Sequence, residues 1–308
     1  MSEIVTREPE TAFQTETGAS ADQESLFRPR TESAAEEPFA AADESASASQ
    51  APAPGPEGAR RVRELSFFFP AHNEEANLAG LVEEALAALP SIAERFEIIA
   101  VDDGSRDRTP QIADDLVAQH PGVFRVVHHP TNYGYGAALR SGLRAARFDL
   151  IAFTDGDRQF NVADVGRLTA RIQEPDSPDA VVGYRLKRAD PPIRRAYARM
   201  YRLANRIFFG VTVRDIDCAC KLFRRPALER IRVESGGAFF TAELLIKLGF
   251  DGCRIAEVGV PHYPRTAGSP TGAKPAVVFR AVRDFWLLRL RLWAARRRAM
   301  GRGESMLA

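Results

Sequence analysis

The sequence has few cysteines, few lysines and no long apolar run. Three cysteines, Cys218, Cys220 and Cys253, are too few for a disulfide framework. The lone C-x-C pair lacks a second pair at zinc-site spacing, so we interpret these residues as small buried hydrophobic side chains. No window of 18 uninterrupted apolar residues occurs, which predicts no transmembrane helix. The N-terminal stretch contains no apolar h-region, so we expect no signal peptide.

The net charge of +1 conceals an uneven distribution along the chain. Residues 1–59 carry 12 acidic residues against three arginines, whereas residues 60–308 carry 39 basic residues against 29 acidic ones. The first segment is rich in Ala, Ser, Glu and Pro, and it cannot bury enough apolar surface to offset its chain entropy. We therefore expect a disordered acidic tail and linker at 1–60, a folded domain at 61–273 and a basic amphipathic helix at 274–308.

Apolar strands alternate with helices in the first half of the folded segment. The expected strands are 64–70, 96–105, 123–129 and 148–157, and the expected helices are 74–89, 109–120 and 135–147. Thr109 is expected to cap the second helix, with Pro110 at its first position. Continuous apolar strands that alternate with helices are typical of an α/β fold with a mostly parallel sheet covered on both faces. The later expected elements are strands 180–185, 220–225 and 253–263 and helices 192–210, 239–250 and 274–300.

The fourth strand runs directly into the acidic stretch TDGDRQF. Asp155 and Asp157 are two residues apart, so on an extended segment both project to the same side. Two close carboxylates repel each other unless they stay solvated or a cation lies between them. Mg²⁺ and Mn²⁺ prefer such hard oxygen ligands, and Gln159 repeats the spacing with a neutral oxygen. Because ligands bind at the carboxyl ends of strands in open α/β sheets, we favour a metal site over a solvated turn.

The second strand also ends in carboxylates, Asp102 and Asp103. These residues can bind a ribose or a base, or cap the following helix, and both roles remain open. The stretch NYGYGAAL lacks the third glycine of a dinucleotide-binding loop, so its glycines are interpreted as allowing a tight turn. His128 and His129 have no partner in sequence and are interpreted as structural or surface residues rather than metal ligands.

Arginines follow the fifth strand. Arg185 ends that strand, and Arg195, Arg199 and Arg202 share one face of the next helix. Such a stripe suits phosphate recognition and a solvated basic face equally well.

Residues 274–302, which include the expected C-terminal helix, carry eight arginines against one acidic residue, Asp284, interleaved with Phe, Trp and Leu. A basic amphipathic helix with tryptophans is typical of membrane-surface binding. Packing onto the domain and contact with nucleic acid are the alternatives, and its apolar side is too rich for nucleic acid alone.

Taken together, these stretches resemble family 2 glycosyltransferases of the GT-A fold, in the dolichyl- and polyprenyl-phosphate sugar synthase branch. The matching stretches cover most of residues 64–272 and include FPAHNEEANL, EIIAVDDGSRDRT, NYGYGAALRSGL, TDGDRQF, VVGYR, DIDCACKLFRR, FFTAELLIKLGF and VGVPHYPRTAGSPTG. Several independent motifs in the right order make the resemblance specific.

The resemblance implies a nucleotide pocket. Pro70, His72 and Glu74 would line it, although His72 replaces a tyrosine that is common in the branch. Val101 and Asp103 would touch the base or the ribose.

The resemblance also implies a catalytic centre around the acidic stretch. Asp155, Gly156 and Asp157 would face the sugar, the ribose and the metal, and Gln159 would be a further metal ligand. The other implied site residues are Arg185 and Arg202, which would meet acceptor or donor phosphates, Arg265, which would close over the diphosphate, and Glu243, which stands where relatives with hydroxyl acceptors place a base.

The implied activity is inverting, metal-dependent transfer of a sugar from a nucleotide-diphospho-sugar donor to a polyprenyl or dolichyl phosphate, with Mg²⁺ or Mn²⁺. Pro270 stands where mannose-type relatives carry a lysine, which favours a UDP-sugar such as UDP-glucose over GDP-mannose. The branch's multi-helix membrane extension is not found, so we expect a cytoplasmic protein with peripheral contact at the inner face of the membrane through the C-terminal helix. No nucleic-acid partner is expected.

Three alternatives remain. The same fold could use a saccharide or another hydroxyl acceptor, or the chain could be a non-enzymatic nucleotide-sugar-binding scaffold. The intact D-x-D stretch, Gln159 and Arg265 favour an enzyme over a scaffold. A sugar nucleotidyltransferase is disfavoured, because PAHNEE stands where such enzymes carry a Gly-rich, Arg-containing loop.

Overall fold

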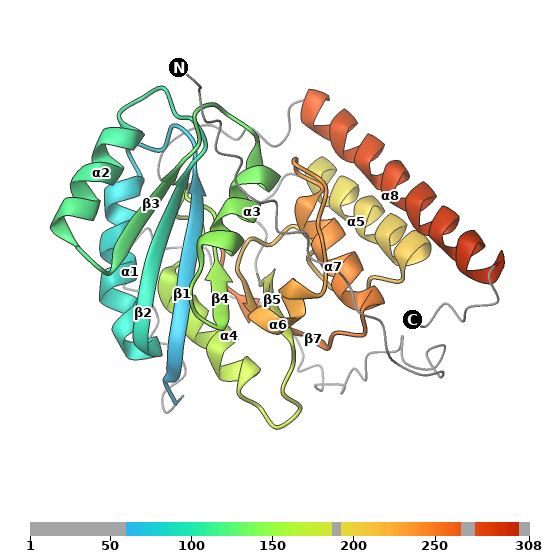
Figure 1. Cartoon of the computed structure of the whole chain (residues 1–308), viewed down its shortest axis with the longest axis horizontal. Helices are drawn as coiled ribbons and strands as arrows, with labels where there is room; N and C mark the ends of the chain where they lie inside the picture. Colours follow the sequence, from blue (N-terminus) through green and yellow to red (C-terminus); the bar gives the residue numbers. More distant parts are fainter. Residues whose placement is uncertain (1–59, 187–191, 266–274, 302–308) are drawn as a thin grey trace, which may run out of the picture.

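The computed structural model of the chain describes residues 60–186, 192–265 and 275–301. The predicted acidic tail and Pro270 lie outside these ranges. A seven-stranded, mostly parallel sheet is surrounded by helices, which confirms the expected α/β fold (Figure 1). The strands, in the spatial order β3-β2-β1-β4-β6-β5-β7, are β3 (Phe124–His128), β2 (Ala93–Asp102), β1 (Val62–Ala71), β4 (Leu150–Phe153), β6 (Lys221–Arg224), β5 (Ala180–Arg185) and β7 (Ile255–Val260).

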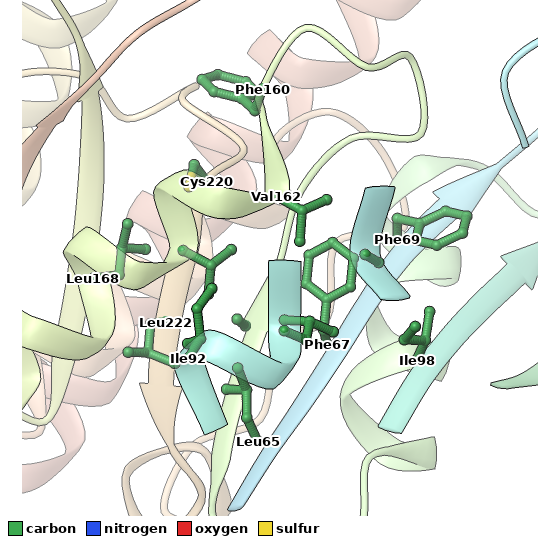
Figure 2. Packing of buried hydrophobic residues seen from close by; sticks show 14 of the residues in the cluster. Leu65, Phe67, Phe69, Ile92, Ile98, Phe160, Val162, Leu168, Cys220 and Leu222 are labelled. Carbon is green, nitrogen blue, oxygen red and sulfur yellow. The ribbon is translucent and has the colours of Figure 1, made fainter. Parts of the chain in front are cut away.

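Helices cover both faces of the sheet, because its central strands are apolar on both sides. On one face, Phe67 and Phe69 of β1 pack in a cluster with α1 (Leu78–Ile92), α2 (Thr109–Gln119) and α4 (Val165–Ile172), part of which Figure 2 shows. On the other face, Phe68 packs in a second cluster. That cluster includes residues of α3 (Tyr135–Ala145), α5 (Pro192–Phe209), α6 (Arg225–Glu229), α7 (Phe240–Phe250) and α8 (Pro275–Gly301). Each Phe side chain of β1 thus follows the two-residue period of a strand.

The parallel register brings several strand ends to one edge of the sheet. β1 pairs in parallel with both β2 and β4, with Pro70 opposite Val101 and Phe68 opposite Phe153. β6 runs antiparallel to β4 and to β5, so β4 and β5 point the same way. Lys221 begins β6 opposite Phe153, and Arg185 ends β5. The edge at which β1, β2, β4 and β5 end is therefore where the predicted site residues gather.

Some expectations about local structure were wrong. Thr109 is the first residue of α2 rather than its cap: its backbone N–H donates to Asp107 (3.0 Å), and its hydroxyl accepts from the backbone N–H of Glu74 (2.9 Å). A carboxylate two residues earlier is a competing N-terminal acceptor. The helices α4 and α6 and a short 3-10 turn, Val162–Asp164, were not predicted. The three cysteines are buried and free, as expected.

Candidate active site

The loop after β4, residues 154–159, holds the two predicted carboxylates. Tyr135, the first residue of α3, donates its hydroxyl to Oδ1 of Asp155 at 2.8 Å. Asp157 accepts from the backbone N–H of Gln159 at 3.1 Å through Oδ1, and from Nη2 of Arg265 at 2.5 Å through Oδ2. Gln159 is tied in turn to Tyr263, whose carbonyl accepts from its amide Nε2 at 3.2 Å. Thus Asp155, Asp157, Gln159 and Arg265 lie in one part of the structure.

The two carboxylates affect each other electrostatically. Burial, and then the neighbouring charge of Asp157, raise the pKa of Asp155 to about 6, although Tyr135, Lys221 and Arg265 favour its ionised form. The pKa of Tyr135 is raised well above its usual value, by burial first and then by Asp155, so its hydroxyl remains a proton donor. The pair therefore holds a concentration of negative charge that a bound cation would stabilise.

The end of β1 lies directly against this loop. A Cβ atom built on Gly156 would lie 2.4 Å from the carbonyl oxygen of Pro70, so only glycine fits between the two carboxylates without a shift of the backbone. Glu74, in the turn before α1, shares this environment. Burial raises the pKa of Glu74, and Asp157 raises it further, whereas Asn77 and Arg265 favour its ionised form.

Asp103 directly follows β2, and its carboxylate is hydrogen-bonded to neighbouring residues. Asp103 accepts from the backbone N–H groups of Tyr133 (2.9 Å) and Gly134 (2.8 Å) and contacts Nδ1 of His129 (2.7 Å). Its carbonyl oxygen lies 3.0 Å from Nδ1 of the exposed His72. Asp103 thus fixes the turn that leads into α3, and Val101, two residues earlier in β2, is fully buried.

The histidines of β3 have partners that the sequence alone did not reveal. Nδ1 of His128 lies 2.9 Å from Asp102, and its Nε2 lies 3.2 Å from Asp114. His129 bridges Asp103 and the hydroxyl of Ser141 (2.8 Å). These contacts support the structural interpretation of both histidines.

An open hollow of about 410 Å³ lies at the carboxyl ends of β2 and β3. Its lining includes Arg106, His128, Thr131 and Asp102, one of the two carboxylates that the sequence offered for a ribose or a base. The residues that the resemblance places in the nucleotide pocket do not line it.

Arg185 and Arg202 belong to a second group of charged residues, which includes Asp215 and Asp217. Arg185 forms a two-pronged ion pair with Asp215, with Nε to Oδ2 at 2.7 Å and Nη2 to Oδ1 at 2.9 Å, and both side chains are largely buried. Arg202 donates to the carbonyl of Arg214 at 3.0 Å. Arg202, Asp215 and Asp217 line a cavity of about 30 Å³, large enough for a water or two. The side chain of Arg195 is not among those the structure describes.

The buried Lys221 interacts electrostatically both with Asp155 of the β4 loop and with Asp215 and Asp217. Lys221 is fully buried, and its ammonium donates to the carbonyl oxygens of Ile216 (3.1 Å) and Cys218. Burial lowers its pKa, whereas Asp215, Asp217 and Asp155 favour its charged form. Sequence reasoning missed Tyr135, Asp215, Asp217 and Lys221. The only signals were their places in the NYGYG and DIDCACK stretches, which do not reveal long-range pairing.

Glu243, on α7, is bonded to the loop that precedes this helix and to Lys247. Its two oxygens accept from the backbone N–H groups of Glu234 (2.9 Å) and Ser235 (2.8 Å), and Lys247 forms an ion pair with it at 2.8 Å. The loop so anchored also meets α3, since the carbonyl of Gly236 accepts from the backbone N–H of Gly136 at 3.1 Å. These contacts favour a positioning role for Glu243.

Metal ligation would depend on few side chains. Within the described ranges, no group of three or more His, Cys, Asp or Glu side chains is arranged to hold a metal ion. A donor set of Asp155, Asp157 and the amide oxygen of Gln159 remains, and carboxylate and amide oxygens are hard ligands that suit Mg²⁺ and Mn²⁺.

Comparison with known sequences identifies the family of the chain. Residues 66–232, more than half of the chain, match the family described as "Glycosyl transferase family 2". The chain is 33% identical over 210 residues to glycosyltransferase AglD of Haloferax volcanii, covering 66% of this chain and 33% of that protein. It is 32% identical over 208 residues to dodecaprenyl-phosphate galacturonate synthase of Rhizobium johnstonii (67% and 60%). It is 33% identical over 165 residues to undecaprenyl-phosphate 4-deoxy-4-formamido-L-arabinose transferase of Pseudomonas aeruginosa (54% and 48%). The chain thus spans between a third and three fifths of these relatives.

Solved structures show the same fold. Glucosyl-3-phosphoglycerate synthase from Mycobacterium tuberculosis, in complex with phosphoglyceric acid, superposes with a TM-score of 0.60 at 23% identity, covering 74% of this chain and 80% of that one. A second structure of that enzyme contains Mn²⁺, uridine diphosphate and glucosyl-3-phosphoglycerate, with a TM-score of 0.58 at 23% identity and the same coverage. The shared architecture is the GT-A fold that the resemblance implied.

Proposed function

The chain belongs to glycosyl transferase family 2, and from this premise we propose that it transfers a sugar from a nucleotide-diphospho-sugar to a polyprenyl phosphate with inversion at the anomeric carbon. In this reaction the bond from the anomeric carbon to the diphosphate breaks as an acceptor phosphate oxygen bonds to that carbon. Two relatives whose names specify dodecaprenyl and undecaprenyl phosphate support the acceptor class.

One observation carries the donor half of this proposal. Asp155 and Asp157 lie at the carboxyl end of β4, with Arg265 bonded to Asp157 at 2.5 Å. A diphosphate leaving group gains negative charge as it departs, and catalysis requires positive groups aimed at that charge. In our proposal Arg265 exchanges its bond to Asp157 for the diphosphate when the donor binds.

The residues present fit a divalent ion. Asp155 and Asp157 would hold it with Gln159, and the mutual repulsion that helps raise the pKa of Asp155 would then be relieved. When bound, such an ion supplies Lewis-acid stabilisation of the diphosphate. Tyr135 would keep Asp155 in place. The buried ammonium of Lys221 would offset part of the negative charge of Asp155. The Mn²⁺ and uridine diphosphate found with M. tuberculosis glucosyl-3-phosphoglycerate synthase agree with this assignment.

The proposed acceptor class is a phosphate because transfer to a phosphate requires no general base. A lipid phosphate is already ionised at neutral pH, whereas a hydroxyl acceptor must lose a proton. Glu243, the base candidate from the sequence, has both oxygens occupied by Glu234, Ser235 and Lys247. The arrangement therefore favours a phosphate acceptor, which Arg202 and Arg185 would meet beside Asp215. Transfer would then take place at the cytoplasmic face of the membrane.

The test is transfer of label from UDP-glucose, UDP-galactose, UDP-N-acetylglucosamine or GDP-mannose into organic-extractable lipid, with polyprenyl phosphate and Mg²⁺ or Mn²⁺. We expect one donor to label lipid only when the metal is present. Asp157→Asn should abolish labelling. Asp149→Asn is the matched control, because Asp149 precedes β4 at its opposite end and its side chain is 88% exposed.

Two outcomes would contradict the proposal. If no donor labels lipid but one is hydrolysed or transferred to a soluble hydroxyl acceptor, the acceptor class is wrong. If no donor binds with or without metal, the transferase assignment itself is wrong for this chain.

A further inference from the structure

The helices α5 and α8 lie side by side on the outside of the molecule, at one end of the view in Figure 1. Aromatic rings join them. The ring of Phe208 lies 5.6 Å from that of Phe285 and 5.2 Å from that of Trp286, and Phe209 lies 4.9 Å from Phe285. The two helices therefore form one continuous surface.

α8 buries only a narrow stripe of its circumference. Phe285 and Leu288 are buried in the core, and Ala281 and Leu292 extend this stripe at helical spacing. A second apolar stripe points to solvent, and Phe279 at its start is 75% exposed. The exposed apolar residues of α8 on this stripe are Phe279, Val282, Trp286, Leu290 and Trp293.

α5 repeats the pattern. Met200, Leu203 and Ile207 follow each other at intervals of three and four residues, so they form one stripe, and Ile207 is 67% exposed. Exposed Arg202 and Arg206 stand one residue before two of these positions and form a basic stripe beside the apolar one. We call the apolar stripes of the two helices, with the arginines beside them, the α5–α8 face.

The charge of this face has one sign. α5 contains no acidic residue in its sequence, and Asp284 is the one acidic residue of α8. Its side chain is 11% exposed and is bonded to Ser235 and Arg283. Arg280 is exposed, and the guanidinium of Arg297 lies 3.8 Å from the ring centroid of Trp293. Basic and apolar groups are thus interleaved on the face.

This combination limits what can cover the face. A second copy of the chain would bring arginines against arginines, which costs energy in a desolvated contact. A nucleic acid would pair its phosphates with the arginines but would leave the apolar stripes without an apolar partner. An anionic lipid surface satisfies both components, because side chains such as Phe279 and Leu290 enter the acyl boundary while the arginines meet headgroup phosphates.

We propose that the α5–α8 face docks on the surface of an anionic membrane, with both helices lying in the plane of the interface. Among the described helices none combines the length and hydropathy needed to cross a bilayer. Both helices contribute to the face, and α5 does so with apolar residues although its sequence suggested only an arginine stripe.

The position of α5 connects this face with the candidate acceptor site. Arg202 lies at the exposed edge of α5 and also lines the small cavity that it shares with Asp215 and Asp217. The reason for docking rests on the proposed lipid acceptor, since a docked α5 would place Arg202 near headgroup depth. The docking itself needs neither donor nor metal.

The experiment is flotation of the full chain with phosphatidylcholine vesicles, with and without phosphatidylglycerol. We expect binding to the anionic vesicles that weakens as salt is added. The double variant Ile207→Ser/Phe279→Ser should lose about tenfold or more of the vesicle affinity, because two side chains that would enter the lipid are removed. The matched control is Phe250→Ser, an exposed phenylalanine on α7 outside the face.

A second variant separates docking from folding. Arg206→Gln/Arg280→Gln leaves the apolar stripes intact and should weaken binding to anionic vesicles without changing the circular dichroism spectrum. Absence of wild-type binding, or equal binding by wild type and both double variants, would overturn the proposal. So would dimerisation in solution that the Ile207→Ser/Phe279→Ser change abolishes. Because flotation uses no donor, its failure is distinguishable from failure of the transfer assay.

Discussion

Replacement of Gly156 by alanine tests how tightly the loop between the two carboxylates is held. The added Cβ would lie 2.4 Å from the carbonyl oxygen of Pro70, whereas ordinary contact begins at 3.4 Å. Because the obstacle is backbone rather than a flexible side chain, relief requires the loop or the end of β1 to move by about 1 Å. Asp155 and Asp157 flank this position and must move with it.

The expected effect on catalysis is large. A displacement of about 1 Å at a group that positions substrate can cost about 100-fold in rate. Overpacking of a well-packed site also costs roughly 1–3 kcal/mol of the free energy of unfolding. We therefore expect Gly156→Ala to lose about 100-fold in kcat/KM for sugar transfer while the protein remains folded.

The assay measures kcat/KM for transfer to polyprenyl phosphate, together with urea unfolding followed by circular dichroism. Gly249→Ala, on α7, is the matched control, because no atom lies within 4 Å of its added Cβ. That substitution should leave both activity and stability near wild type, since alanine is favoured within a helix. Wild-type kcat/KM in Gly156→Ala would refute the close approach of this loop to β1.

Two further predictions concern stability. Gly142→Ala on α3 should lower the free energy of unfolding by roughly 1–3 kcal/mol in urea titrations, because its Cβ would lie 2.1 Å from Cδ2 of the Phe68 ring; an unchanged midpoint would contradict this packing. For His128, burial opposes the charged form, but hydrogen bonds to Asp102 and Asp114 outweigh it and raise the pKa above 6.5. Its charged form therefore stabilises the fold below about pH 6.5, and this contribution is lost as the pH rises through the folded-state pKa. The stability difference between wild type and His128→Gln, measured by urea unfolding, should accordingly be larger at low pH than at high pH, and a difference that grows with pH would contradict the pairing.

Much of the fold follows from the sequence, because the signals are local. Continuous apolar strands separated by helices predict a parallel sheet, and the ends of β1, β2 and β4 then share one edge. This is why Asp155 and Asp157 were correctly placed at that edge together with Pro70. The helix α4 was missed because it directly follows the loop and a short 3-10 turn, with no clear boundary in the sequence.

The pairing of charges was decided only by tertiary structure. Arg265 meets Asp157 across 108 residues, Arg185 meets Asp215 across 30, and the hydroxyl of Tyr135 meets Asp155 across 20. The periodicity of a sequence reports which face of an element is apolar, and it contains nothing about which distant side chain will arrive beside it. The sequence alone therefore determined the sheet, the edge and the residue types of the site. The packing of separate elements decided which charges are paired and which apolar stripes of α5 and α8 face solvent, because these depend on contacts made only when the chain is folded.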